Sequence, residues 1–127
     1  MTNEEIRDQL QQAIKGERVM LFMKGTPDEP RCGFSARVIS MLDVMGTEYS
    51  ALDILPDPRI RQELSELSGW PTIPQLFVNG ELVGGCDIVT EMFETGELAD
   101  TLGVPQPELE QAPAAQAPGQ SPPLQIG

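Results

Sequence analysis

The stretch Cys32-Gly33-Phe34-Ser35 combines a nucleophilic side chain with a position suited to activate it. It lies between an apolar run at residues 19–23 and a helical pattern that begins at Gly33. The free N–H groups of a helix's first turn and the helix dipole favour negative charge, so both lower the pKa of a thiol placed there. The thiolate is the form that acts as nucleophile and as metal ligand. Three residues on, where a dithiol enzyme carries its second cysteine, the chain has Ser35.

The composition limits the chemistry that this chain can perform by itself. Its 127 residues suffice for one domain, and no apolar run approaches the roughly 20 residues that span a membrane. Two cysteines do not make a disulfide framework, and the absence of histidine excludes a Cys-His dyad or a histidine-based zinc site within the chain. Residues 1–5 lack the basic and then apolar layout of a signal peptide. We therefore expect a cytoplasmic protein whose cysteines are free, catalytic or metal-bound.

Charge is distributed unevenly along the chain. Residues 1–61 carry eight basic and ten acidic side chains, a net −2, whereas residues 62–127 carry ten acidic side chains and no basic one, a net −10. This balance argues against binding to nucleic acid or to an anionic membrane. An anionic ligand would have to find its cations in the first half, although most of these charges are also explained as a solvated surface.

Capping signals and apolar periodicity predict five helical segments and four strands. The helices are expected at 2–14, 33–45, 57–68, 87–95 and, as a short turn, up to Leu102, and the strands at 19–23, 48–54, 75–78 and 81–83. The second helix should turn Phe34 and Val38 inward, and the fourth, capped by Asp87, should bury Ile88 and Val89. Asn79-Gly80 predicts a tight hairpin between the last two strands.

This order of elements predicts an α/β fold. A β-α-β unit implies a right-handed parallel crossover, and the hairpin adds antiparallel strands, which gives a four-stranded mixed sheet flanked by helices on both faces. Residues 105–127 hold six prolines and are otherwise rich in Ala and Gln. Such a segment buries too little apolar surface to offset its ordering entropy. We therefore predict one domain at 1–104 and a disordered Pro/Ala/Gln-rich tail at 105–127.

Four motifs occur in order along this domain. They are Met-Lys-Gly-Thr-Pro at 23–27, Cys-Gly-Phe-Ser at 32–35, Trp-Pro-Thr-Ile-Pro-Gln at 70–75 and Gly-Gly-Cys-Asp at 84–87. Together they resemble a monothiol glutaredoxin of the single-domain Cys-Gly-Phe-Ser class. The resemblance covers about residues 2–103 and implies a thioredoxin-like fold, in agreement with the element order derived above.

The resemblance implies a glutathione site around Cys32. Cys32 would supply the thiolate, and Lys24 and Arg61 would meet the glycine-end carboxylate of glutathione. A cis bond before Pro74 would turn the Ile73 backbone outward, where it could pair with the tripeptide like an added strand.

At Cys86 and Asp87, the resemblance implies a further contact with glutathione. A helix N-terminus there would offer N–H groups to the γ-glutamyl carboxylate, and the Asp87 side chain would suit the ammonium group. Without the resemblance, residues such as Lys24 and Arg61 are most often solvated surface charges. Residues 84–85 also fit a tight turn, and Cys86 fits a small buried hydrophobe better than a second reactive thiol. The sequence also allows the alternative hypothesis that Cys32 and Cys86 form a transient disulfide.

Two functions of different classes follow from the same thiol. In the class that this chain resembles, two protomers share a labile 2Fe–2S cluster held by one cysteine thiolate from each and by two glutathiones. This implies a homodimeric cluster carrier that serves apo iron–sulfur proteins, with a BolA-type protein as partner. Because Ser35 cannot resolve a disulfide, the alternative is a glutathione-dependent monothiol oxidoreductase, in which a second glutathione releases Cys32. A weaker third reading is an iron or redox sensor.

Overall fold

The computed structural model describes residues 1–106. Nine elements follow one another: α1 (Asn3–Gly16), β1 (Val19–Met23), α2 (Gly33–Met45), β2 (Ser50–Asp53), α3 (Pro58–Ser68), β3 (Gln75–Val78), β4 (Glu81–Gly84), α4 (Cys86–Thr95) and α5 (Glu97–Leu102). The predicted tail from Pro105 onward lies outside the described residues except for its first two positions. No helix in the described part is long and apolar enough to cross a membrane.

The strands form one mixed sheet in the order β2-β1-β3-β4. β1 pairs in parallel with β2 and antiparallel with β3, and β3 pairs antiparallel with β4. All five residues of β1 are buried, as expected for a central strand covered on both faces. The predicted α/β architecture with a four-stranded mixed sheet is therefore confirmed.

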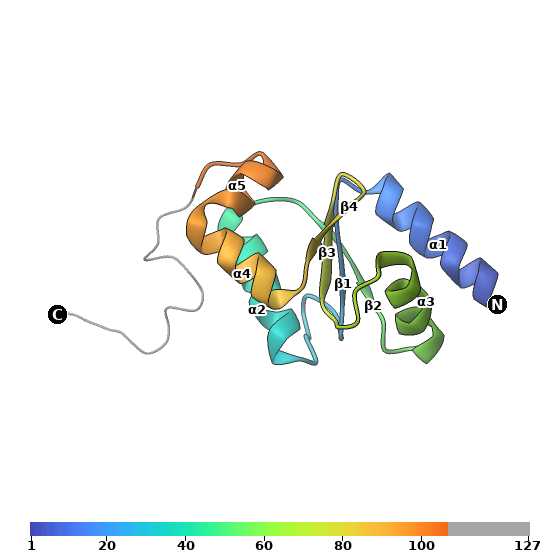
Figure 1. Cartoon of the computed structure of the whole chain (residues 1–127). Coiled ribbons are helices and arrows are strands. Elements are labelled where there is room, and N and C mark those ends of the chain that lie inside the picture. Colours follow the sequence, from blue (N-terminus) through green and yellow to red (C-terminus); the bar gives the residue numbers. More distant parts are fainter. Residues whose placement is uncertain (107–127) are drawn as a thin grey trace.

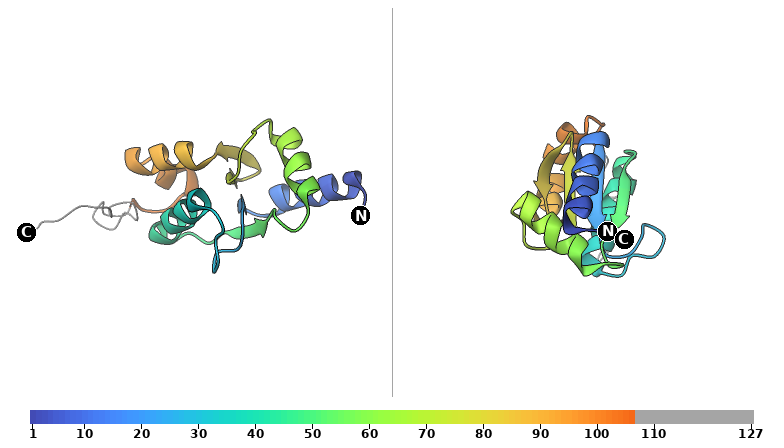
Figure 2. Two further views of the ribbon diagram at one scale, coloured as in Figure 1. Left: turned by 90° about the horizontal axis from the view of Figure 1, so that it is seen from below. Right: turned by 90° about the vertical axis from the view of Figure 1, so that its right-hand side faces the viewer.

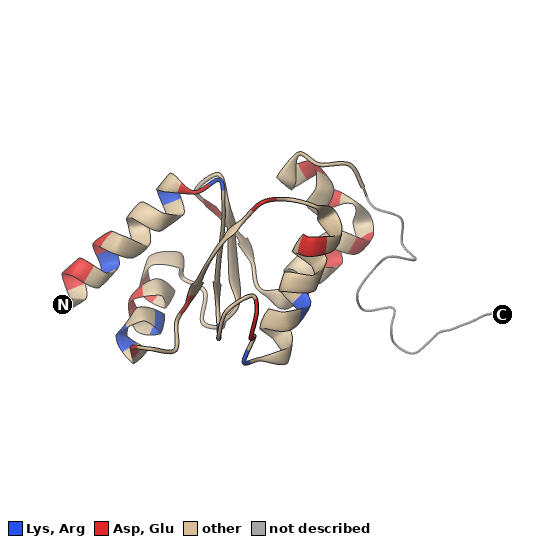
Figure 3. Ribbon diagram, turned by 180° about the vertical axis from the view of Figure 1, so that it is seen from behind, with Lys and Arg blue, Asp and Glu red and all other residues tan. Residues whose placement is uncertain are grey.

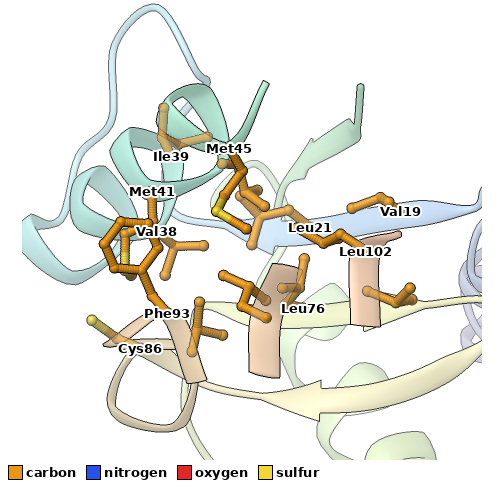
Figure 4. Close-up of a cluster of buried hydrophobic side chains, with 14 of the residues drawn as sticks. Val19, Leu21, Val38, Ile39, Met41, Met45, Leu76, Cys86, Phe93 and Leu102 are labelled. Carbon is orange, nitrogen blue, oxygen red and sulfur yellow. The ribbon is translucent and has the colours of Figure 1, made fainter. Parts of the chain in front are cut away.

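Helices cover both faces of this sheet, which Figure 1 shows nearly edge-on. α1 and α3 lie on one side of the sheet and α2, α4 and α5 on the other, and the views in Figure 2 agree. Each side has its own core: Leu10, Phe22 and Leu64 belong to the cluster under α1 and α3, whereas Leu21, Leu42 and Phe93 belong to the cluster under α2, α4 and α5. Figure 4 shows this second cluster.

Local signals account for most of the helix ends. Thr2 and Glu5 form the predicted capping box of α1, and Asp57 accepts a hydrogen bond from the Arg59 N–H at the start of α3. Gly46 ends α2 in the left-handed conformation. At the hairpin, Asn79 and Gly80 have φ angles of 53° and 82°, the positive values that a primed turn requires.

The structure corrects four expectations. β2 is shorter than the predicted strand at 48–54. Asp87 does not cap α4, because Gly85 occupies the N-cap position and the helix begins at Cys86. Phe34 and Ile88, predicted to face inward, are 60% and 37% exposed. Both residues lie in the first turn of their helices. Because helical side chains tilt toward the N-terminus, a first-turn side chain projects past the start of its helix, where less of the core covers it.

Candidate functional site

Cys32 is the N-cap residue of α2, with extended backbone angles, and its side chain is half-buried. The Ser35 backbone N–H is the main influence that lowers the pKa of the Cys32 thiol; the Phe34 N–H and the positive charge of Lys24 add to it, and burial opposes it. The Ser35 hydroxyl also lowers the pKa of the thiol, so hydrogen-bond donors at the helix start contribute more than the charge of Lys24. The helix start thus favours a thiolate at this position, as the sequence predicted.

Ser35 occupies the position where a second active-site thiol would stand. It is fully buried, and its Oγ accepts a hydrogen bond from the Lys24 backbone N–H at 3.2 Å. The hydroxyl therefore ties the first turn of α2 to the end of β1. Both Cys32 and Lys24 are held in place by this link.

The structure brings Lys24 and Arg61 to one open groove of about 890 Å³, between the end of β1 and α3. Trp70 and Pro71 form another part of its wall. Arg61 Nη2 donates to the Pro71 carbonyl oxygen at 3.3 Å, which connects α3 to the loop before β3. Two cations from distant segments thus share a groove, an arrangement that suits a carboxylate ligand. Cys32 does not line this groove, but the charge of Lys24 acts on its thiol.

A second, smaller hollow of about 190 Å³ lies beside this groove. The residues that line it come from the start of α2, the loop before β3 and the start of α4: Phe34, Trp70, Thr72, Ile73, Pro74, Gly85, Cys86 and Asp87. The Ile73–Pro74 bond is cis, as predicted. Trp70 lines both hollows, so the predicted residues Lys24, Arg61, Ile73, Cys86 and Asp87 are arranged along one continuous surface.

Cys86 is only 8% exposed and belongs to the core cluster, where Figure 4 places it near Phe93. Its sulfur lies 3.9 Å from Thr90 Oγ1, and the same hydroxyl donates to the Cys86 carbonyl oxygen at 2.7 Å. Both cysteines are free. The structure thus favours the packing role of Cys86 over that of a second reactive thiol.

Gly85 allows α4 to approach the loop before β3. A Cβ atom at this position would lie 3.0 Å from Trp70 Nε1 and 3.3 Å from the Pro74 carbonyl oxygen. Residues 84–85 are therefore more than a tight turn, since the missing side chain leaves room for the indole ring of Trp70. This contact brings the first turn of α4 to the smaller hollow.

Three features of the site were missed by sequence reasoning. Phe34 exposes its ring directly after Cys32 and Gly33, and Leu55, which is 48% exposed, lines the larger groove. Gln75 is fully buried beneath the loop that joins the hollows. A polar residue directly after a predicted cis proline at the start of a buried strand was the available signal for Gln75.

Within residues 1–106, no group of three or more His, Cys, Asp or Glu side chains is arranged to hold a metal ion. The one half-exposed thiol of this part of the chain is Cys32.

Comparison with known proteins agrees with this geometry. The Glutaredoxin family model matches residues 19–83. Monothiol glutaredoxin-S11 from Oryza sativa subsp. japonica is 51% identical over 102 residues, which are 80% of this chain but only 21% of that longer protein. Probable monothiol glutaredoxin 2 from Rickettsia typhi is 52% identical over 93 residues, 73% of this chain and 84% of the relative.

Solved structures show the same fold. The solution structure of reduced poplar apo GrxS14 superposes with a TM-score of 0.72 at 39% identity and covers 81% of this chain and 95% of that one. The crystal structure of a buckwheat glutaredoxin–glutathione complex superposes with a TM-score of 0.71 at 26% identity. The match covers 80% of this chain and 90% of the buckwheat chain. The fold is therefore thioredoxin-like, of the glutaredoxin type. This chain belongs to the glutaredoxin family, and the two relatives above, at about 50% identity, are named monothiol glutaredoxins.

Proposed function

We propose that this monothiol glutaredoxin is a glutathione-dependent carrier of 2Fe–2S clusters. In this proposal Cys32 supplies one thiolate per protomer, and two glutathiones supply the other two ligands of a cluster bridged between two protomers. The main support for this proposal is the half-exposed Cys32, because the start of α2 favours its thiolate. Ser35 and Cys86 are both buried. A single reachable thiol per chain fits a cluster that takes half of its ligands from outside the protein.

The proposed glutathione site is the surface formed by the two hollows. Lys24 and Arg61 would meet the glycine-end carboxylate, the Ile73 backbone would pair with the tripeptide, and the first turn of α4 at Cys86 with the Asp87 carboxylate would meet the γ-glutamyl group. The residues present fit this ligand: two cations lie at one end and a helix start with a carboxylate at the other. The glutathione complex of the buckwheat relative supports the assignment.

The exposed ring of Phe34 supports the homodimeric form. It lies in the first turn of α2, which Cys32 caps, and a second protomer that shares a cluster through Cys32 would approach this turn. Burying an aromatic ring is a common way to stabilise such a contact. A BolA-type protein and apo iron–sulfur proteins are the further partners that we propose, and the cytoplasm is the proposed compartment, because two free cysteines suit a reducing environment.

The second candidate function is glutathione-dependent thiol–disulfide exchange, which the lowered pKa of Cys32 favours. The Cys32 thiolate would attack the glutathione sulfur of a protein–glutathione mixed disulfide, and the protein thiolate would leave and take up a proton. A second glutathione thiolate would then attack the Cys32–glutathione disulfide, which gives oxidised glutathione and restores the Cys32 thiolate.

Anaerobic cluster reconstitution with glutathione tests the first function, read by visible absorbance and gel filtration. We expect a 2Fe–2S chromophore on a dimer that is absent without glutathione and in Cys32→Ala. Cys86→Ala is the matched control and should keep both chromophore and dimer, because Cys86 packs in the core. A colourless wild-type monomer that turns over a glutathione mixed disulfide would replace the carrier with the oxidoreductase.

A further inference from the structure

Gln75 is a buried polar residue directly after the cis Ile73–Pro74 bond. It is the first residue of β3 and lies opposite Phe22 of β1. Its side-chain Nε2 donates two hydrogen bonds to backbone carbonyl oxygens, to that of Trp70 at 3.0 Å and to that of Thr72 at 3.1 Å. One amide group thus binds the backbone carbonyls on both sides of Pro71.

This arrangement leaves polar atoms without partners. Because carbonyl oxygens can only accept, the amide must turn its N–H groups toward them, which fixes the place of Oε1. In the described part of the chain, Gln75 Oε1 and Trp70 Nε1 are the buried side-chain polar atoms that lack a hydrogen-bond partner. Trp70 lies in the loop before β3, and Gln75 lies directly after that loop. A buried unpaired polar atom lowers stability. Stability alone therefore does not explain an amide at this position.

The segment that Gln75 holds, residues 70–73, joins the two hollows of the candidate site. Trp70 lines both hollows, and Thr72 lines the smaller one. Between them, the Pro71 carbonyl oxygen accepts the hydrogen bond from Arg61. Any movement of this segment would shift the wall of both hollows and one of the two cations at the same time.

We propose that Gln75 is a positioning residue for glutathione: by holding the Trp70 and Thr72 carbonyls, it keeps residues 70–73 in the conformation that binds the tripeptide. The inference rests on the proposed glutathione site. Gln75 does not touch the ligand itself, since its side chain is fully buried. It acts through residues 70–73. Because this segment is already ordered before glutathione binds, binding costs less conformational entropy.

The test compares the wild-type chain with Gln75→Met, which keeps the length of the side chain but has no N–H donor. Calorimetric titration with reduced glutathione should give an affinity about tenfold lower for the variant. Its melting temperature should change by less than about 5 °C, because the unpaired Oε1 is removed together with the two hydrogen bonds. Acrylamide should quench Trp70, the single tryptophan of the chain, more readily in Gln75→Met.

Leu102→Val is the control for a general loss of stability. Figure 4 places Leu102 near Val19, at the opposite end of β1 from Lys24. This variant should lower the melting temperature without changing glutathione affinity or Trp70 quenching. If Gln75→Met does not fold, Gln75→Asn replaces it: the shorter amide keeps its polarity but cannot reach both carbonyls, so its affinity should also fall.

The outcomes separate this inference from the function on which it rests. Wild-type binding together with equal affinity in the folded Gln75 variants overturns the positioning role and leaves the glutathione site in place. Unchanged Trp70 quenching in those variants also overturns it, because the segment would then be held without Gln75. A wild-type chain that does not bind glutathione overturns the proposed site and the inference together.

Discussion

The lowered pKa of Cys32 comes from its place at a helix start rather than from a histidine beside it. The chain has no histidine, and the main cause of the lowered pKa of Cys32 is a backbone N–H, that of Ser35. The Lys24 side chain adds its charge from the end of β1. Any residue at position 35 can supply the N–H, whereas the contribution of Lys24 depends on its side chain.

The rate at which iodoacetamide alkylates Cys32 should follow the thiolate fraction, with a midpoint below the ordinary cysteine pKa of 9.0. Lys24→Ala should move this midpoint upward, because the thiolate loses a favourable charge, but not all the way to the ordinary value, since the Ser35 N–H remains. Lys15→Ala, at the end of α1, is the charge-matched control and should leave the profile in place. The same midpoint in wild type and Lys24→Ala would show that Lys24 does not act on the thiol.

The loop between β1 and α2 is a closed structural element. Its ends meet where the Arg31 N–H donates to the Lys24 carbonyl oxygen at 2.8 Å, and the backbones of Thr26 and Glu29 bond to each other in both directions. The Gly25 N–H donates to Asp53 Oδ1 at 2.9 Å, which fastens the loop to the end of β2. Figure 2 shows the loop projecting beside the sheet. These hydrogen bonds fix the position of the backbone that leads into Cys32.

Gly25→Ala should disrupt this loop. Gly25 has a φ of +90°, and a Cβ atom there would lie 2.4 Å from the Glu29 carbonyl oxygen and 2.7 Å from the Arg31 nitrogen. Strain of this kind lowers the free energy of unfolding by about 1–3 kcal/mol, which urea denaturation measures. The matched control is Gly16→Ala, at the end of α1, where a Cβ atom would meet nothing within 4 Å. Equal midpoints for Gly25→Ala and wild type would mean that the loop adapts without strain.

At the scale of the whole molecule, charge is distributed unevenly among the helices. Figure 3 shows acidic positions along α4 and α5 with no basic residue among them, whereas α1 and α3 carry both signs. On the α1 and α3 side the charges pair: Arg7 contacts Glu63 at 2.8 Å and Glu66 at 2.6 Å. The full chain carries a net charge of −12. Two copies that share a cluster must therefore approach against long-range repulsion.

Salt should strengthen the proposed cluster-bridged dimer. Raising the ionic strength from about 0.01 M to about 0.15 M shortens the Debye length from about 30 Å to about 8 Å, which screens repulsion between the protomers. With glutathione in excess, sedimentation of the reconstituted protein should show a dissociation constant that falls over this range. The control is glutathione saturation of the monomeric apo chain, measured at both salt concentrations. A dimer that weakens with salt would indicate that attractive ion pairs across the contact outweigh the net charge.

Much of the fold was predictable because its signals are local. Thr2 with Glu5, Asp57 with Pro58, and Asn79 with Gly80 each act within a few residues, so the chain's own neighbours set these helix starts and this turn. The failures concern the length of β2 and the starts of two helices. Periodicity along a helix does not show how far the core extends beneath its first turn, so Phe34 and Ile88 were placed inward although they are 60% and 37% exposed.

The element order and the thiol at a helix start follow from local sequence, since capping groups, apolar periodicity and the backbone of a first turn need no distant partner. The assembly of the candidate site does not. Lys24 and Arg61 meet in one groove only because α3 packs beside the end of β1. Cys86 faces a core cluster built from several elements, and Gln75 is buried where β3 pairs with β1, because burial is decided by segments far apart in the chain. Those contacts exist only once the sheet and its two helical layers have come together.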